Sequence, residues 1–253
     1  MCCFPFAAAV TTSPARQVLQ FTRDFAAKAP EDLSLLATLW NAPDAEPVPQ
    51  EYRQTPVIIV AGCYSGPPET AEQVIRPLRE ITTPIADLTR PMPFESVQTF
   101  LDADYPHGGL YYWKSAYLPE LNEPALNLLI GRAAARPSPL SSLDVFFLNG
   151  AVTRVPADQT AFARRDMPYL VTIKANWTDP GQSDANIAWT RDTFEDLQPF
   201  AHGSYLNFPG FMEDSDKLLQ GAYEANYERL GAIKAKYDPD NLFHGVLNIV
   251  PRP

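Results

Sequence analysis

The chain has 253 residues, of which 45% are apolar and 20% charged, and these proportions are typical of a globular protein. Its formal net charge of -10 argues against nucleic-acid binding, because a protein that neutralises phosphates needs a basic face. No uninterrupted apolar run approaches the roughly 20 residues of a membrane-spanning helix, which argues against a membrane protein. The apolar N-terminus has no basic residue ahead of it, so a secretory signal matches poorly and a cytoplasmic location is favoured.

The first part of the chain predicts alternating strands and helices. Residues 1–10 are interpreted as a first strand, and Ser13 and Pro14 open a helix that Pro30 closes. The apolar residues that share one face of this helix are Val18, Phe21, Phe25 and Ala29. Two strand-like runs follow at residues 33–40 and 56–64, joined by a polar, proline-rich connection typical of a long hairpin.

The middle of the chain repeats this order. A helix is predicted over residues 66–81, and residues 82–106 are irregular or mixed. The later segments are interpreted as a strand, a helix, two strands and a helix, at residues 110–117, 119–135, 143–148, 169–177 and 184–197. This order favours an α+β fold, with an antiparallel sheet and helices packed mainly on one face. No repeat of fixed period is visible in the sequence.

The C-terminal region reads as one helix with a clear ending. Apolar residues recur every three or four positions from Ser215, a plausible N-cap, to Tyr237. Asp238 and Pro239 stop the helix because proline disfavours helical geometry in the residue before it. The following turn is expected to carry Leu242 and Phe243 into the core.

Common catalytic signatures are missing from the sequence. The 12 glycines form no dinucleotide or phosphate-binding motif, and no serine stands in a nucleophile-elbow motif. The three histidines, His107, His202 and His244, are far apart and have no acidic or cysteine neighbour at ligand spacing, so no metal site is predicted.

Several segments nevertheless resemble one enzyme family. The C-terminal motifs are Tyr-Leu-Asn-Phe at residues 205–208, Asn-Tyr-Glu-Arg-Leu at 226–230, and Tyr-Asp-Pro-Asp-Asn-Leu-Phe at 237–243. Residues 112–115, 149–162 and 177–180 look like the middle of bacterial members. Together they resemble the berberine bridge enzyme-like FAD-linked oxidases of the vanillyl-alcohol oxidase superfamily.

The resemblance implies a substrate domain at residues 1–200 and a C-terminal segment at residues 201–253 that returns to the FAD domain. It implies FAD as cofactor and an alcohol, sugar, phenol or secondary metabolite as substrate. An FAD-binding domain precedes this region in family members, so a separate partner chain or self-association is expected. None of Cys2, Cys3 and Cys63 matches the cysteine that links flavin covalently in the family.

Flavin oxidation of an alcohol removes a proton from oxygen and a hydride from carbon, so the site needs a base. Tyr205 and Asn207 are two residues apart and would share one side of a strand, which by resemblance faces the flavin. Tyr205 can act as a base only beside a cation, and Lys114 or Arg165 can supply it. The alternative is that Tyr205 is a core aromatic residue.

Further residues are assigned by the same resemblance. Tyr112 and Arg165 are expected at the substrate pocket, although one face of the strand that holds Tyr112 must be core. Tyr227 contacts FAD or anchors the tail on the FAD domain. Asn241 either hydrogen-bonds the flavin or caps the preceding helix. Arg164 stands where many relatives have histidine.

Two functions follow from these observations. The first is the substrate-binding and C-terminal part of an FAD-dependent oxidoreductase, inactive as an isolated chain. The second is a small-molecule-binding or interaction module that has kept the substrate-domain fold without redox chemistry.

Overall fold

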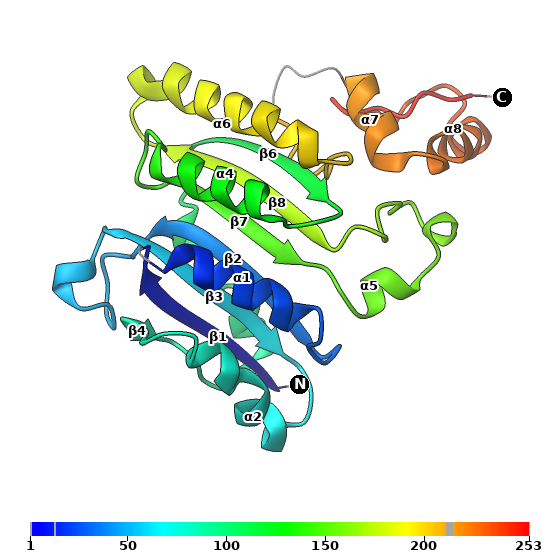
Figure 1. Cartoon of the computed structure of the whole chain (residues 1–253). Coiled ribbons are helices and arrows are strands. Elements are labelled where there is room, and N and C mark those ends of the chain that lie inside the picture. Colours follow the sequence, from blue (N-terminus) through cyan, green and yellow to red (C-terminus); the bar gives the residue numbers. More distant parts are fainter. Residues whose placement is uncertain (1, 13, 211–214, 253) are drawn as a thin grey trace.

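The computed structural model describes residues 2–12, 14–210 and 215–252, and for residues 2–11 and 215 it describes the backbone alone. Its centre is an eight-stranded antiparallel sheet in the order β4-β1-β3-β2-β7-β8-β6, with β5 paired to β1 (Figure 1). The predicted α+β class is therefore confirmed.

The first half of the sheet is built from one hairpin and the N-terminal strand. Strands β1 (Cys2–Thr11), β2 (Leu33–Asn41) and β3 (Pro56–Tyr64) are accompanied by helices α1 (Ala15–Ala26) and α2 (Pro68–Arg79). Valine and isoleucine in β3 pack well on a pleated surface, which is why this run forms a strand.

A second unit follows with the same order of elements. It consists of β6 (Leu110–Leu118), α4 (Glu123–Ala134), β7 (Ser142–Phe147), β8 (Tyr169–Trp177) and α6 (Ser183–Leu197). Both units run strand, helix, strand, strand, helix, and they meet where β2 pairs with β7. The duplicated order in the sequence thus corresponds to a duplicated topology.

Short elements connect the two units. These are β4 (Ala86–Asp87), β5 (Met92–Pro93), α3 (Phe94–Gln98) and the 3₁₀ turn η2 (Asp102–Asp104). They confirm the mixed structure predicted for residues 82–106. A second short helix, α5 (Ala151–Arg154), lies in the long connection between β7 and β8.

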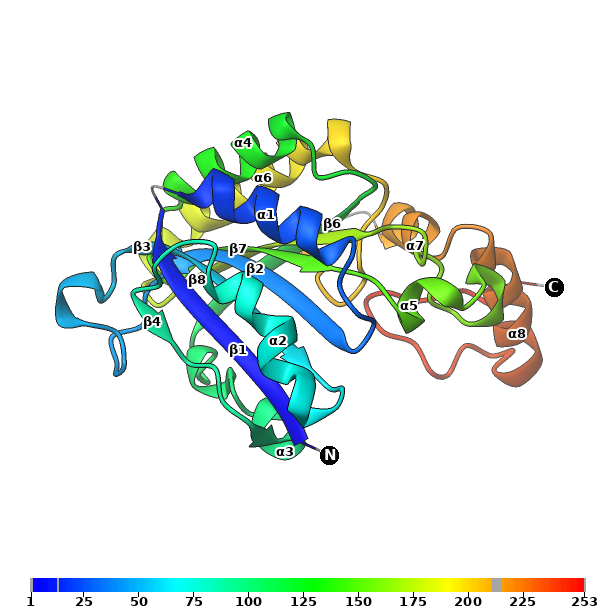
Figure 2. The same ribbon diagram turned by 60° about the horizontal axis from the view of Figure 1, so that its bottom comes forward.

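Helices α1, α4 and α6 cover one face of the sheet (Figure 2). Their buried side chains and those of α2 join alternate residues of the strands in the main apolar cluster, with Leu35 and Ile173 from the sheet and Trp189 from α6. On α1, the buried stripe includes Leu19 and Thr22, whereas Phe21, predicted to be on the buried face, is 37% exposed. Ser13 lies outside the described residues.

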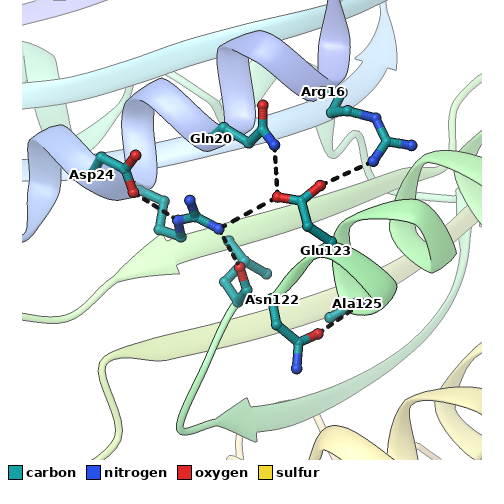
Figure 3. A network of polar contacts seen from close by, with 8 residues as sticks. Arg16, Gln20, Asp24, Asn122, Glu123 and Ala125 are labelled. Carbon is teal, nitrogen blue, oxygen red and sulfur yellow. Dashed lines mark hydrogen bonds and ion pairs between the residues drawn. The ribbon is translucent and has the colours of Figure 1, made fainter.

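A polar network ties α1 to the start of α4 (Figure 3). The Glu123 carboxylate accepts hydrogen bonds from Arg16 at 3.0 Å and from Gln20 at 2.6 Å. Asn122 caps α4, because its side-chain oxygen accepts from the Ala125 amide at 3.1 Å. The two helices are thereby held side by side over the centre of the sheet.

The C-terminal region forms two helices rather than the one predicted. Helix α7 (Ser215–Tyr223) ends where Glu224 adopts a φ of 46°, and α8 (Asn226–Tyr237) begins after it. A left-handed residue cannot continue a helix, so the chain changes direction there. The predicted capping side chain of Ser215 lies outside the described side chains.

Helix α8 ends at Tyr237, as predicted, because Asp238 holds the turn. Its carboxylate accepts from the amides of Leu242 at 2.8 Å and Phe243 at 3.0 Å, and it pairs with Lys234. These bonds keep the pKa of Asp238 below its ordinary value, with the Lys234 hydrogen bond as the main cause. The expectation that Leu242 and Phe243 enter the core is wrong, since they are 75% and 81% exposed.

Within the part of the chain that the structure describes, no helix is both long and apolar enough to cross a membrane.

Candidate functional site

The face of the sheet opposite the main helices carries a cavity of about 470 Å³. It extends across β2, β3, β7 and β8 and is bordered by the segment from α3 to Tyr105. This volume falls in the range of roughly 300–1,000 Å³ that small-molecule sites occupy. Side chains alternate between the two faces of a sheet, so every second strand residue points away from the helices and toward this cavity.

A buried ion pair stands in the wall of this cavity. Lys174 Nζ of β8 lies 2.7 Å from Asp144 Oδ2 of β7, and the two residues are 8% and 2% exposed. Lys174 also donates to the Tyr105 hydroxyl at 3.2 Å, and Thr172 donates to Asp144 Oδ2 at 3.2 Å. The second carboxylate oxygen, Asp144 Oδ1, is buried without a hydrogen-bond partner among the described residues.

The electrostatics of this group keep Lys174 charged. Burial on its own lowers the pKa of a lysine, but Asp144 and Tyr105 outweigh it, and the pKa of Lys174 is raised above its ordinary value. Burial raises the pKa of Tyr105. Lys174 is therefore an ammonium ion and Tyr105 a neutral phenol at neutral pH, which leaves Asp144 as the acceptor of the group.

Aromatic rings continue from this ion pair to the sheet edge. Trp113 of β6 lies edge-on to Tyr105 at 5.3 Å and contacts Phe208 at 5.6 Å, and Phe208 contacts Tyr205 at 5.8 Å. Lys174 Nζ lies 5.5 Å from the centre of the Trp113 ring. A single aromatic wall thus joins Tyr205 to the ion pair.

Tyr205 is positioned by β6. The fully buried Ser115 hydroxyl accepts from the Tyr205 amide at 3.0 Å and donates to its carbonyl at 3.1 Å. Residues 205–208 form a turn, not the predicted strand, and the Phe208 amide donates to the Tyr205 carbonyl. The side chains of Tyr205 and Asn207 meet all the same, because Asn207 Nδ2 donates to the Tyr205 hydroxyl at 2.7 Å.

A second, smaller cavity of about 180 Å³ lies beside Tyr205. Its walls include Tyr117, Phe162 and Arg164, and burial raises the pKa of Tyr117. The cation at this cavity is Arg164, whose side chain pairs with Glu224 at 2.6 Å and donates to the Gly221 carbonyl. Arg164 therefore links the wall of the cavity to the tail helices.

The predicted place of Lys114 and Tyr112 is wrong. Both residues point to the helix-covered face, where Lys114 Nζ lies 4.2 Å from the centre of the Phe194 ring and Tyr112 accepts from Arg191 at 3.1 Å. The strand period of two puts Trp113 on the cavity face and its two neighbours in the core. Lys114 is thus not the cation beside Tyr205.

Arg165 is also not at the cavity where the sequence placed it. Its guanidinium donates to the Val152 carbonyl and to the Thr160 hydroxyl, both at 2.8 Å, and lies 5.2 Å from the centre of the Phe162 ring. Arg165 therefore fastens the long connection between β7 and β8, while its neighbour Arg164 reaches the smaller cavity.

Tyr227 and Asn241 lie in the tail. Tyr227 is 4% exposed and its ring is covered by the Arg252 guanidinium at 4.7 Å. Asn241 adopts a φ of 53° in the turn after α8, and its side-chain oxygen is enclosed without a described partner. Asp238, not Asn241, caps α8, and a role for either Tyr227 or Asn241 toward flavin stays a prediction.

The sequence argument missed Asp144 and Lys174. The available signal was a charged residue inside each of two strand-like runs, with Asn176 two positions beyond Lys174 on the same face. Charges in buried strands require partners, and here each supplies the other. Among the described residues, no group of histidine, cysteine, aspartate and glutamate is arranged to hold a metal ion.

Comparison of the sequence with known proteins identifies relatives of this chain. Residues 204–250 match the family model "Berberine and berberine like". The FAD-linked oxidoreductase YvdP of Bacillus subtilis is 30% identical over 75% of this chain and 43% of its own length, and YgaK of the same organism is 28% identical over 75% and 42%. Residues 204–250 are therefore a berberine bridge enzyme-like domain, and the chain is homologous to part of the FAD-linked oxidoreductases that carry it.

Solved structures agree with this assignment at the level of fold. The berberine bridge enzyme-like protein 28 of Arabidopsis thaliana matches with a TM-score of 0.78 and 18% identity, covering 100% of this chain and 57% of that one. A chitooligosaccharide oxidase matches with a TM-score of 0.76 over 99% of this chain and 56% of that one. The chain spans less than half the length of the curated relatives it matches.

The residues of this chain are compatible with FAD chemistry nearby. Trp113, Phe208 and Tyr205 offer aromatic surface, Lys174 offers a positive charge, and the enclosed oxygens of Asp144 and Asn241 lack described partners. A flavin-dependent alcohol oxidation needs a proton acceptor beside the substrate hydroxyl and a positive charge where negative charge develops. Asp144 and Lys174 are residues of these two chemical types.

Proposed function

We propose that this chain is the substrate-binding part of an FAD-linked oxidoreductase that oxidises a hydroxyl group of a small organic molecule. The observation that carries the proposal is the Lys174–Asp144 pair in the wall of the cavity, in which one carboxylate oxygen has no hydrogen-bond partner among the described residues. Bound FAD accepts the hydride from the substrate carbon in such a reaction.

The residues of the chain have separate tasks in this proposal. The Asp144 carboxylate accepts the hydrogen bond and then the proton of the substrate hydroxyl. The Lys174 ammonium stabilises negative charge as it develops on the substrate oxygen, and it also holds Asp144 in place. Tyr105 lines the cavity and contacts the substrate, and Trp113, which packs against Tyr105, limits water near the ion pair.

Tyr205 has a different task in this proposal. The Asn207 amide donates to its hydroxyl oxygen, which leaves the hydroxyl proton available for a ligand at the far end of the aromatic wall. This role of Tyr205 is a positioning one, because the structure places Lys114 on the other face of the sheet and Tyr205 lacks the predicted cation.

The alternative is a binding module without redox chemistry. To separate the two, the chain is purified with FAD, alone and co-expressed with the FAD-binding part of a relative, and an alcohol panel is added without oxygen. Loss of the yellow flavin colour on addition of an alcohol supports the oxidoreductase. Alcohol binding that needs no flavin, with no bleaching in either preparation, supports the binding module instead.

A further inference from the structure

The larger cavity is divided between the two duplicated units. Strands β7 and β8 line it with four polar or charged residues, Ser142, Asp144, Lys174 and Asn176, and with Phe146 near the end of β7. Strands β2 and β3 contribute no charged side chain to it, and their largest contributions are Leu36, Trp40 and Ile59. One half of the cavity is therefore mainly polar and the other half mainly apolar.

The apolar half of the cavity continues from the strands onto the segment that includes α3. Val97 of α3 faces the cavity together with Phe100 and Leu101, and Ala86 and Leu88 complete this side. Phe100 and Leu101 are 39% and 48% exposed although they border the cavity. Large apolar side chains that remain exposed beside a cavity are stabilised when an apolar ligand covers them.

The hydrogen-bonding groups of the apolar half are few. Ser34 and Thr38 are the polar side chains that β2 brings to the cavity, and Thr38 lies at the junction, paired in the sheet with Asp144. A sugar ring placed over Leu36, Ile59 and Ala61 would bury several hydroxyl groups with too few partners, which is costly. An apolar group placed there brings no hydroxyl groups that need partners.

We infer that the substrate is an amphipathic alcohol, whose hydroxyl lies at Asp144 and Lys174 and whose alkyl or aryl body lies over β2 and β3 beneath Phe100 and Leu101. This inference rests on the proposed function for the position of the hydroxyl. The apolar subsite itself is independent of the reaction and is tested by binding.

The test is calorimetric titration of the full chain with benzyl alcohol, 4-ethylbenzyl alcohol, 4-butylbenzyl alcohol and methyl glucoside. Affinity is expected to rise about threefold for each buried methylene, with a negative heat-capacity change, and methyl glucoside is expected to bind most weakly. Equal affinities along the series, absence of binding by all three benzyl alcohols, or tightest binding of methyl glucoside would overturn the inference.

Variants locate the subsite. In Phe100→Ser/Leu101→Ser the dependence on chain length is expected to flatten at least fivefold between the first and last alcohols. Phe94→Ser is the matched control, since Phe94 is 50% exposed on α3 and does not line the cavity. An unchanged series in the double variant, or an equal flattening in the control, contradicts the subsite.

Failure of the proposed function gives a different result. If the length dependence holds in the titration while FAD-loaded protein is not reduced by any of the alcohols, the apolar subsite stands and the oxidoreductase assignment fails.

Discussion

Lys174 is paired in the sheet with Trp113, whereas Lys114, one residue along the same strand as Trp113, is paired with Ile173. Two buried lysines on neighbouring strands therefore point to opposite faces of one sheet. Lys174 faces the cavity and Asp144, and Lys114 faces α6 and the ring of Phe194. Lys174 thus has a proposed role in the reaction, whereas Lys114, which is also buried, packs in the core.

The first prediction compares these lysines. Lys174→Met leaves the Asp144 carboxylate buried without its cation, so we expect a loss of about 3 kcal/mol in unfolding free energy and a loss of flavin reduction. Urea denaturation and anaerobic reduction of FAD-loaded protein measure the two effects. Lys114→Met is the control, and it is expected to retain reduction within a few fold.

The double variant Lys174→Met/Asp144→Leu separates stability from chemistry. Replacing both charges by apolar groups removes the unpaired charge, so most of the lost stability is expected to return. Flavin reduction is not expected to return with it. Recovery of turnover together with stability would show that the pair has a structural role alone.

The second prediction concerns pH. The pKa of Lys174 is raised in the folded chain, so the stability that it contributes is present in full below its ordinary pKa of about 10.5 and is lost as the pH rises through the folded pKa. The stability difference between wild type and Lys174→Met should therefore be constant from pH 7 to about pH 10 and shrink above it. A difference that shrinks already between pH 7 and pH 9 contradicts the ion pair.

The fold could be predicted from sequence to a large extent, and the site only in part. Strand and helix periods in residues 33–64 and 110–197 gave the α+β class and the duplicated order, because burial of one face imposes those periods. The face of β6 that lies on the cavity side of the sheet could not be chosen, since Tyr112 and Trp113 are both aromatic and the period of two does not say which side carries the helices. Asp144 and Lys174 met through strand pairing across 30 residues of chain, which no local pattern encodes.

The C-terminal tail also has features that local sequence patterns did not predict. The stop signal at Asp238 and Pro239 was local and was confirmed. The break, in contrast, falls at Glu224, a residue type that does not predict a left-handed conformation. Exposure of Leu242 and Phe243 depends on what packs against the tail, which is a property of tertiary structure and assembly.

The third prediction concerns Gly203, which joins the turn of Tyr205 to β6. Its φ is 82°, and an added Cβ would lie 2.6 Å from Arg164 Nη2 and 2.7 Å from the Gly221 carbonyl. We expect Gly203→Ala to lower the unfolding free energy by about 2 kcal/mol. Gly131→Ala is the opposite control, because an added Cβ on this exposed position of α4 meets nothing, and it should stabilise by up to about 1 kcal/mol. Thermal unfolding of both variants measures the difference.

The fourth prediction concerns association of the chain. Leu242, Phe243 and Val246 are 75%, 81% and 90% exposed at the C-terminal turn, and exposed apolar groups of this size favour association. We therefore expect Leu242→Ser/Phe243→Ser to shift the purified chain toward monomer in size-exclusion chromatography. Leu140→Ser, at a 44% exposed position away from the tail, is the control. A wild-type chain that elutes as a monomer at high concentration contradicts the prediction.

The most direct measurement of the proposed chemistry is the rate of anaerobic flavin reduction in FAD-loaded wild type and Asp144→Asn, with whichever of a panel of aryl, alkyl and sugar alcohols reduces the wild type fastest. Asparagine keeps the shape of Asp144 but cannot accept the hydroxyl proton. We predict that the rate falls by a factor of about 10²–10⁴ while FAD content and the folded structure are retained. A rate within threefold of wild type would show that Asp144 is not the base.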